Sequence, residues 1–176
     1  MKMHDEKGFT LIELLIVVAI IGIIAAIAVP GLLRARMSGN EASAIGSLRA
    51  VNSAQSTYSS SCGGGGYATT LTMLSTPPAG STSAFISPDL RVNNVTKAGY
   101  LVNVGPGLVA TPIMTAGSSC NGTNAEATYF AEAHPVTPGS TGTRGFGTDQ
   151  RSTLFQNLTG VAFTNATVAS STTPVN

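Results

Sequence analysis

The sequence predicts an α+β fold in which a long N-terminal helix, apolar in one half and amphipathic in the other, packs on a small antiparallel β-sheet head. Residues 9–33 read FTLIELLIVVAIIGIIAAIAVPGLL, with Glu13 as the only charge. Apolar residues then recur every three or four positions as far as Tyr58, which is typical of a half-buried helix. Short alternating runs bounded by glycine and proline follow residue 99 and predict strands. We therefore expect an apolar helix over 9–33, a stem helix over 34–60 and a β-rich head over 61–176.

The composition argues against several classes of function. Charged residues make up 10% of the chain and the net charge is +1, so no cluster of Lys and Arg suggests a nucleic-acid partner. The two histidines, His4 and His134, have no cysteine at metal-ligand spacing, and no base stands ready to activate a serine or threonine. Glu126, Glu132 and Asp149 lack the oxygen-rich loop of a calcium site. We predict no catalytic, cofactor-binding or metal site, and therefore no enzyme.

The apolar run is long enough to cross a membrane. The residues from Leu14 to Leu33 carry no charge, and about twenty residues of helix span about 30 Å, the thickness of a hydrocarbon core. Three fates are open. The first is a secretory signal peptide, for which residues 26–28 (Ala-Ile-Ala) have the small-x-small form of a cleavage site. The second is a permanent membrane anchor. The third is a precursor that is cut ahead of the run and keeps the helix. Glu13 favours the last fate, because a signal peptide has an uncharged core there.

Glu13 has two interpretations. It lies near the positive end of the helix dipole and can reach the membrane interface. Alternatively it awaits a cation: if the chain is cut after Gly8, the new α-amino group of Phe9 stands one helical turn before it, in the same subunit or a neighbour. A paired charge in a low-dielectric helix bundle fixes axial register, whereas an unpaired one is costly. We therefore predict that Glu13 sets register during assembly.

The segment Lys7-Gly8-Phe9-Thr10-Leu11-Ile12-Glu13, followed by the apolar run and Pro30, resembles the N-terminus of type IV pilins and type II secretion pseudopilins. That family has a short charged leader ending in Gly, then an aromatic residue, then Glu four positions later. The similarity continues through LLRARMSGNEASAIGSLRAVNSAQSTY and covers residues 1–60, about a third of the chain.

The resemblance implies a leader over residues 1–8, removed between Gly8 and Phe9 by a prepilin peptidase that also methylates the Phe9 amino group. It implies a single-pass precursor in the inner membrane, an inner-membrane assembly machinery as partner, and homo-oligomerisation into a cell-surface pilus or a periplasmic pseudopilus. The leader is placed in the cytoplasm by the resemblance alone, because two basic residues flank the span on either side and the positive-inside count is a tie. The alternative is an exported or membrane-anchored binding module that forms no filament.

Two residues can interrupt the helix. Pro30 removes a backbone donor and clashes with the preceding turn, so it either ends the span or kinks one long helix. Gly22 is a second weak point, and in related filaments the segment between these positions is thought to loosen on assembly. Small residues around Gly22 also form a face for close helix approach; they are Ala19, Gly22, Ala25 and Ala26.

The stem and head are predicted in less detail. The stem stripe comprises Ala42, Ile45, Leu48, Val51 or Asn52, Gln55 and Tyr58. Charged residues off the stripe are expected to be solvated or paired between subunits; they are Arg34, Arg36, Glu41 and Arg49. Residues 68–98 are predicted as loop with a short helix at 71–74, strands follow at 99–104, 128–133, 144–148 and about 153–155, and the tail 164–176 is expected to fray.

Cys62 and Cys120 are either two unrelated buried thiols or a disulfide. We favour the disulfide, because the head has the character of an exported domain and oxidising compartments support such bonds. Closing a loop of this length stabilises a fold by about 4 kcal/mol in the chain-entropy model.

Overall fold

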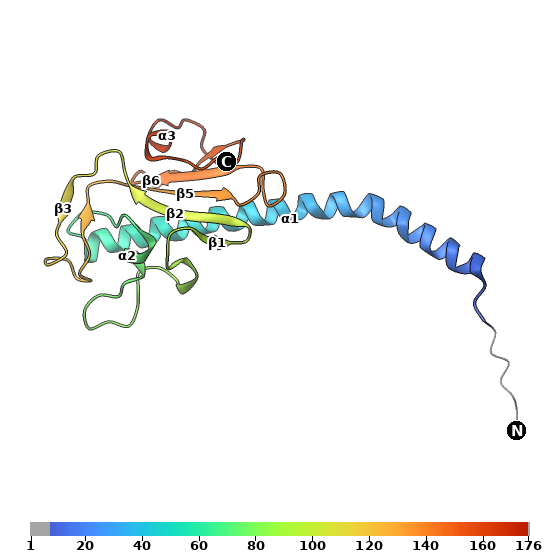
Figure 1. Cartoon of the computed structure of the whole chain (residues 1–176). Coiled ribbons are helices and arrows are strands. Elements are labelled where there is room, and N and C mark those ends of the chain that lie inside the picture. Colours follow the sequence, from blue (N-terminus) through green and yellow to red (C-terminus); the bar gives the residue numbers. More distant parts are fainter. Residues whose placement is uncertain (1–7, 176) are drawn as a thin grey trace, which may run out of the picture. The chain divides into compact units, whose positions relative to one another are not determined.

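The computed structural model describes residues 8–175, which form two compact units joined within one helix. Helix α1 runs without interruption from Leu11 to Ser61 (Figure 1). The first unit ends at Arg36 and contains only the start of this helix, whereas the second begins at Met37 and contains the rest of the chain. Pro30 therefore does not end the apolar span, because a single helix continues through it.

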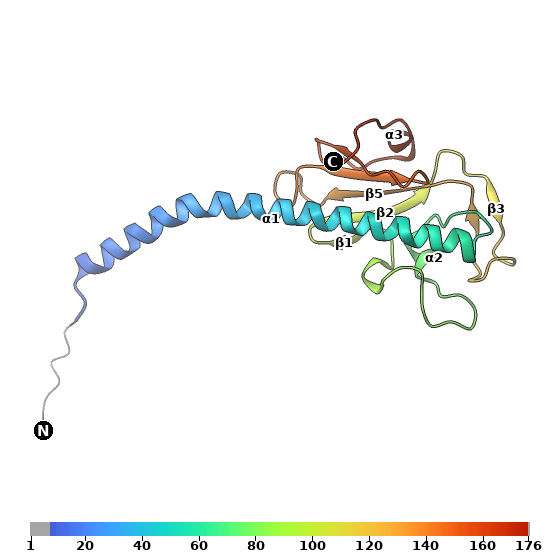
Figure 2. The ribbon, with the colours of Figure 1, turned by 180° about the vertical axis from the view of Figure 1, so that it is seen from behind.

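The second unit is built on a five-stranded antiparallel sheet in the order β1-β2-β5-β6-β7. Figure 2 shows the second half of α1 lying across one face of this sheet. The central pair, β2 and β5, is in register over seven residues, from Tyr100 opposite Pro135 to Pro106 opposite Tyr129. The strands are β1 Val95–Lys97, β2 Tyr100–Pro106, β5 Tyr129–Pro135, β6 Gly145–Asp149 and β7 Phe155–Asn157.

Smaller elements complete the second unit. Strands β3 (Pro112–Met114) and β4 (Ala125–Glu126) form a separate two-stranded sheet between β2 and β5 in sequence. Short helices α2 (Leu71–Ser75) and η1 (Pro88–Leu90) precede β1, and α3 (Asn165–Ala169) follows β7. The predicted short helix and the predicted α+β class are confirmed.

The core lies between α1 and the sheet. Leu48, Val51 and Tyr58 of α1 are fully buried against inward-facing residues of the sheet such as Val102 and Phe146. Helical spacing places the three α1 residues on one stripe, while strand alternation turns every second sheet residue toward them. Burying side chains of this size contributes about 1.5–3 kcal/mol each, which holds this half of α1 to the sheet.

Two expectations for this region are wrong. Ala42 is exposed, and Glu41 is buried in its place rather than solvated. The stripe therefore begins one residue earlier than the apolar pattern suggests, because Glu41 has partners in Thr143 and Arg144, just before β6, that make its burial tolerable.

The expectation of a frayed tail is also wrong up to residue 175. Thr164 caps α3 with a capping box closed by Thr167, and Val168 is fully buried. The chain then returns to β7, where the Val175 N–H donates to the Leu154 carbonyl at 2.8 Å. Together with Phe155 and Phe163, Val168 forms a second apolar cluster.

Candidate assembly site on the N-terminal helix

The apolar part of α1 has no cover from any residue between 8 and 175. Every large apolar side chain from Phe9 to Leu33 is exposed, with exposed fractions from 48% to 82%. Within the described residues, α1 is the one helix long and apolar enough to cross a membrane, and none of its apolar window is buried. So large an exposed apolar surface marks a segment that is covered by lipid or by other protein chains.

Glu13 and Thr10 form a capping box at the start of this helix. The Thr10 hydroxyl and backbone N–H both donate to Glu13 Oε2, at 2.6 and 2.9 Å, and the Glu13 N–H donates to Thr10 Oγ1 at 3.3 Å. Such a reciprocal pair satisfies two orphan backbone donors of the first turn. Glu13 thus already has a partner within its own subunit, while its Oε1 accepts no hydrogen bond from any residue between 8 and 175.

The predicted cleavage point lies directly before this cap. Gly8 and Phe9 precede the helix in non-helical, exposed chain, and a Cβ at Gly8 would meet no atom within 4 Å. Residues 1–7 of the predicted leader lie outside the described residues. An exposed, non-helical peptide bond is open to a peptidase, as cleavage at this position requires.

The predicted weak points of the helix lie within its uncovered length. A Cβ built at Gly22 or at Gly31 beside Pro30 meets nothing within 4 Å, so no packing within the chain requires glycine at either position. Their effects are therefore on the helix backbone itself, where Gly costs about 1 kcal/mol relative to Ala and Pro removes one backbone hydrogen bond.

A buried ion pair anchors α1 where it enters the second unit. Glu41 is 6% exposed and accepts four hydrogen bonds between 2.8 and 3.2 Å, from Thr143 N and Oγ1 and from Arg144 N and Nε. A second guanidinium nitrogen of Arg144 forms an ion pair with Glu41 Oε2 at 2.7 Å. Burial acts to raise the pKa of Glu41, but the hydrogen bonds from Thr143 and Arg144 outweigh it and hold the pKa below its usual value of 4.5. Arg144 also donates to the Gln156 side chain at 2.8 Å. These contacts join the stem to β6 and β7.

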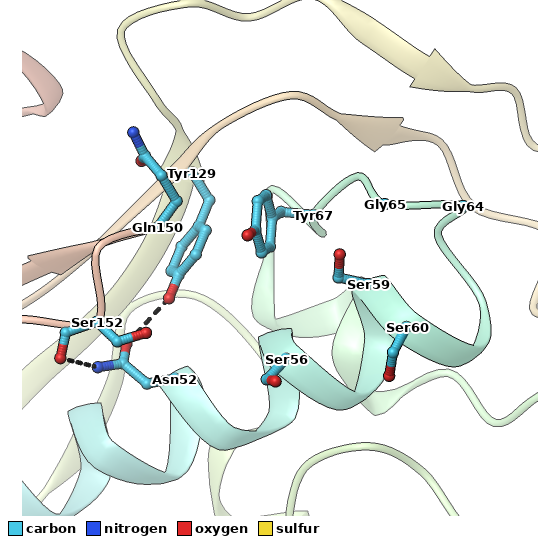
Figure 3. A pocket seen from close by; sticks show the side chains of 10 residues that line it. All are labelled: Asn52, Ser56, Ser59, Ser60, Gly64, Gly65, Tyr67, Tyr129, Gln150 and Ser152. Atoms are coloured by element: carbon cyan, nitrogen blue, oxygen red, sulfur yellow. Dashed lines mark hydrogen bonds between the residues drawn. The ribbon is translucent and has the colours of Figure 1, made fainter.

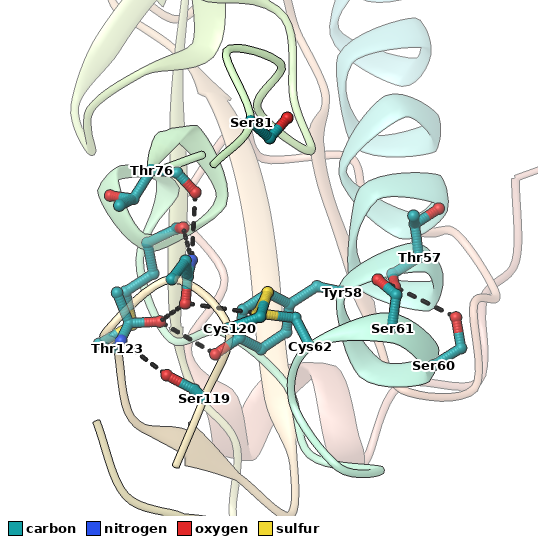
Figure 4. The surroundings of a disulfide bond; sticks show 12 residues. Thr57, Tyr58, Ser60, Ser61, Cys62, Thr76, Ser81, Ser119, Cys120 and Thr123 are labelled. Carbon is teal, nitrogen blue, oxygen red and sulfur yellow. Dashed lines mark hydrogen bonds between the residues drawn. A yellow bond between two sulfur atoms is a disulfide. The ribbon is translucent and has the colours of Figure 1, made fainter. Parts of the chain in front are cut away.

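The far end of α1 is fixed by the disulfide between Cys62 and Cys120, whose Cα atoms are 4.9 Å apart. This confirms the favoured alternative for the two cysteines. The Tyr58 ring lies beside the bond (Figure 4), and its hydroxyl is 3.0 Å from Thr123 Oγ1. The bond ties the last turn of the stem to the loop before β4, so both ends of the stem are attached to the head.

The carboxylates Glu132 and Asp149 have separate partners. Glu132 is buried on the sheet and bonds to the Asn103 amide and to His134 Nδ1, at 2.7 and 2.8 Å. Burial raises the pKa of Glu132, against the lowering effect of these two partners. Asp149 instead pairs with Arg151 at 2.8 Å. Among the described residues, no group of three His, Cys, Asp or Glu side chains is arranged to hold a metal ion.

Comparison with known proteins assigns the N-terminal segment. The family model of the prokaryotic N-terminal methylation motif matches residues 3–29. The chain is 62% identical over 39 residues to the type IV wide pilus major component PilA4 of Thermus thermophilus, which is 22% of this chain and 30% of that protein. Over this segment, the chain carries the N-terminal methylation motif and is similar to type IV pilins.

Two further relatives match the same N-terminal part of the chain. It is 48% identical over 53 residues to the type IV major pilin protein PilA of Myxococcus xanthus, covering 30% of this chain and 24% of that protein. It is 79% identical over 28 residues to a fimbrial protein of Pseudomonas aeruginosa, covering 16% and 18%. The matches therefore span less than a third of each relative's length. No solved structure was found to match this chain.

Proposed function

We propose that the chain is a structural subunit of a type IV pilus or of a secretion pseudopilus, assembled through α1. The observation that carries the proposal is the uncovered apolar helix, which is exposed from Phe9 to Leu33 and overlaps the methylation motif matched over residues 3–29.

In this proposal the precursor is a single-pass protein of the inner membrane, and a prepilin peptidase removes residues 1–8 and methylates Phe9. The assembly machinery then transfers the helix from lipid to the centre of a filament. Dispersion contacts between small and apolar side chains of neighbouring helices supply the cohesion there, because lipid tails are as apolar as the helices themselves.

Glu13 has two roles in the proposed filament. Its Oε2 completes the helix cap with Thr10, and its Oε1 remains for a cation. After cleavage, the Phe9 α-amino group of the same or a neighbouring subunit is that cation. Because an unpaired carboxylate among packed apolar helices is unfavourable, the pair selects one axial register over others.

The mature N-terminus tests the proposal. The chain is expressed with its native assembly system, recovered from membranes and from sheared surface material, and analysed by intact mass and N-terminal sequencing. A chain beginning with methylated Phe9 supports the proposal. A chain beginning at Val29 shows that signal peptidase removed the helix, and one beginning at Met1 shows a permanent anchor; both outcomes favour the non-filamentous binding module and refute the pilin role.

A further inference from the structure

An open cavity in the second unit is lined by uncharged polar side chains. It has a volume of about 550 Å³ and lies between the last turns of α1, the loop of four glycines over residues 63–66 (the glycine loop) and the β6–β7 loop (Figure 3). The lining residues are Asn52, Ser56, Ser59, Ser60, Gly64, Gly65, Tyr67, Tyr129, Gln150 and Ser152. The side chains that line it end in hydroxyl, carboxamide or phenol groups, and none of them is charged.

One wall of the cavity is rigid. Asn52 accepts a hydrogen bond from the Tyr129 hydroxyl at 3.0 Å and donates to Thr148 Oγ1 and to the Ser152 carbonyl, at 3.1 and 3.3 Å. Tyr129 is buried, and the ring of Tyr67 packs on it with ring centres 5.0 Å apart. These contacts hold the Tyr67 ring in place at the mouth of the cavity.

The cavity lining also carries free hydrogen-bonding groups. Within residues 8–175, the side chains of Ser56, Ser59, Tyr67 and Gln150 have no hydrogen-bond partner. Neighbouring hydroxyls behave differently, since Ser60 and Ser61 both donate to the Thr57 carbonyl. In Figure 3 the Ser59 hydroxyl is directed toward Tyr67 and the glycine loop. These four groups are available to a ligand.

The glycine loop keeps the cavity open. Its Gly64 and Gly65 have φ of +58° and +91°, which favours glycine at both, and the Gly65 N–H donates to the Ser59 carbonyl at 3.0 Å. A Cβ at Gly65 would meet no atom within 4 Å, so this part of the loop is bare backbone facing open space. The loop thus caps α1 while adding no side chain of its own to the cavity.

We propose that this cavity binds a neutral pyranose sugar, with the Tyr67 ring packing on the sugar's C–H face and the hydroxyls of Ser56, Ser59 and Tyr67 bonding its hydroxyl groups. Hydroxyl and carboxamide groups donate and accept hydrogen bonds as sugar hydroxyls do, and an aromatic face complements the apolar face of the ring. The absence of a cation among the lining residues makes the site selective against acidic sugars. A ligand of about 12 heavy atoms in an open site is expected to bind with Kd on the order of 1–10 mM.

Saturation-transfer difference NMR tests this inference on the full-length chain in a zwitterionic detergent without a sugar headgroup. The probes are D-glucose, D-galactose and N-acetyl-D-glucosamine, with N-acetylneuraminic acid as the acidic comparison. The test variant is the triple change Ser56→Ala, Ser59→Ala and Tyr67→Phe, which removes only hydroxyls that make no internal hydrogen bond. The matched control is Ser53→Ala, an exposed serine of the same helix that does not line the cavity.

We expect at least one neutral sugar to give transfer to its ring protons with the wild-type and Ser53→Ala chains. Affinity should fall at least about tenfold in the triple variant, since each lost hydrogen bond accounts for a factor of about 2–10. The single changes serve as the test if the triple variant does not fold. The inference is overturned if no neutral sugar gives transfer at 50 mM (about five times the weakest expected Kd). Equal binding by the triple variant, or equal binding of the acidic sugar, overturns it as well.

Discussion

Replacing Glu41 with glutamine should destabilise the second unit by about 2–3 kcal/mol. The carboxylate accepts four hydrogen bonds from Thr143 and Arg144 and forms an ion pair with the Arg144 guanidinium. The amide of Glu41→Gln keeps one acceptor oxygen but turns an N–H2 group toward the Arg144 guanidinium. Breaking one side of a buried pair costs about 3–5 kcal/mol. The Arg144 side chain is 34% exposed, so water can solvate the guanidinium after the change. The expected loss of stability is therefore reduced to about 2–3 kcal/mol.

Urea unfolding of the full-length chain in zwitterionic detergent measures this effect. The chain has four tyrosines and no tryptophan, so near-UV circular dichroism of the tyrosines reports the packing of the second unit. The free energy of unfolding follows from the midpoint and the slope. Arg49→Gln is the matched control, because Arg49 is exposed on the same helix and should change stability by less than about 0.5 kcal/mol.

Acid provides an independent check with a defined sign. Since the folded-state pKa of Glu41 lies below 4.5, its stabilisation is fully present above that pH and is lost as the pH falls through the lower folded-state value. The wild-type and Glu41→Gln curves should therefore differ near pH 7 and converge in acid. A Glu41→Gln chain within about 0.5 kcal/mol of wild type at pH 7 would refute the reasoning. So would additive effects of Glu41→Gln and Arg144→Met in a double-mutant cycle.

Three further outcomes are expected. Replacing Cys62 and Cys120 with serine should lower the free energy of unfolding by up to about 4 kcal/mol, measured by urea unfolding, and a reductant should then have no further effect; unchanged stability would show that the bond constrains little. Gly142→Ala places a methyl group against the hydroxyl of the buried Tyr100 and should lower stability by about 1–3 kcal/mol, measured by thermal unfolding. The control Gly117→Ala, which has nothing within 4 Å, should be near neutral. Equal effects of the two changes would contradict the packing. Glu13→Ala should abolish fibres recovered by shearing. Glu13→Gln separates the two roles of this residue, since glutamine can close a capping box but cannot form an ion pair with an amine. Normal fibres with Glu13→Gln would show that the cap alone matters.

The strands were predictable where alternation and boundaries are strong. Strands β2, β5 and β6 begin one residue after the predicted starts, because glycine, proline and alternating apolar residues mark them locally. Strand β1 was missed because it has three residues and exists only by pairing with β2. Its two-residue turn has positive φ at both Ala98 (48°) and Gly99 (73°), and alanine there hides the usual Asn-Gly signal.

The candidate site was predictable where the signal is local in sequence. The spacing Thr10-x-x-Glu13 is the sequence pattern of a capping box. Glu13 was interpreted by its charge, and this cap was not predicted. The burial of Glu41 could not be predicted from the sequence, because its partner Arg144 lies 103 residues further along the chain. Polar residues in a helical pattern are assigned to the surface by default, and only the sheet shows which of them has a buried partner.

The central claim is that copies of this chain cover one another's apolar helices. Incorporation of a photo-crosslinking phenylalanine analogue at Val18, in the middle of the uncovered helix, followed by irradiation of sheared fibres, tests it directly. The account predicts covalent dimers and higher oligomers of this chain, with crosslinks mapping to residues 9–33 of the neighbouring copy. Fibres without this chain, or crosslinks at Val18 to lipid or to other proteins alone, would contradict it.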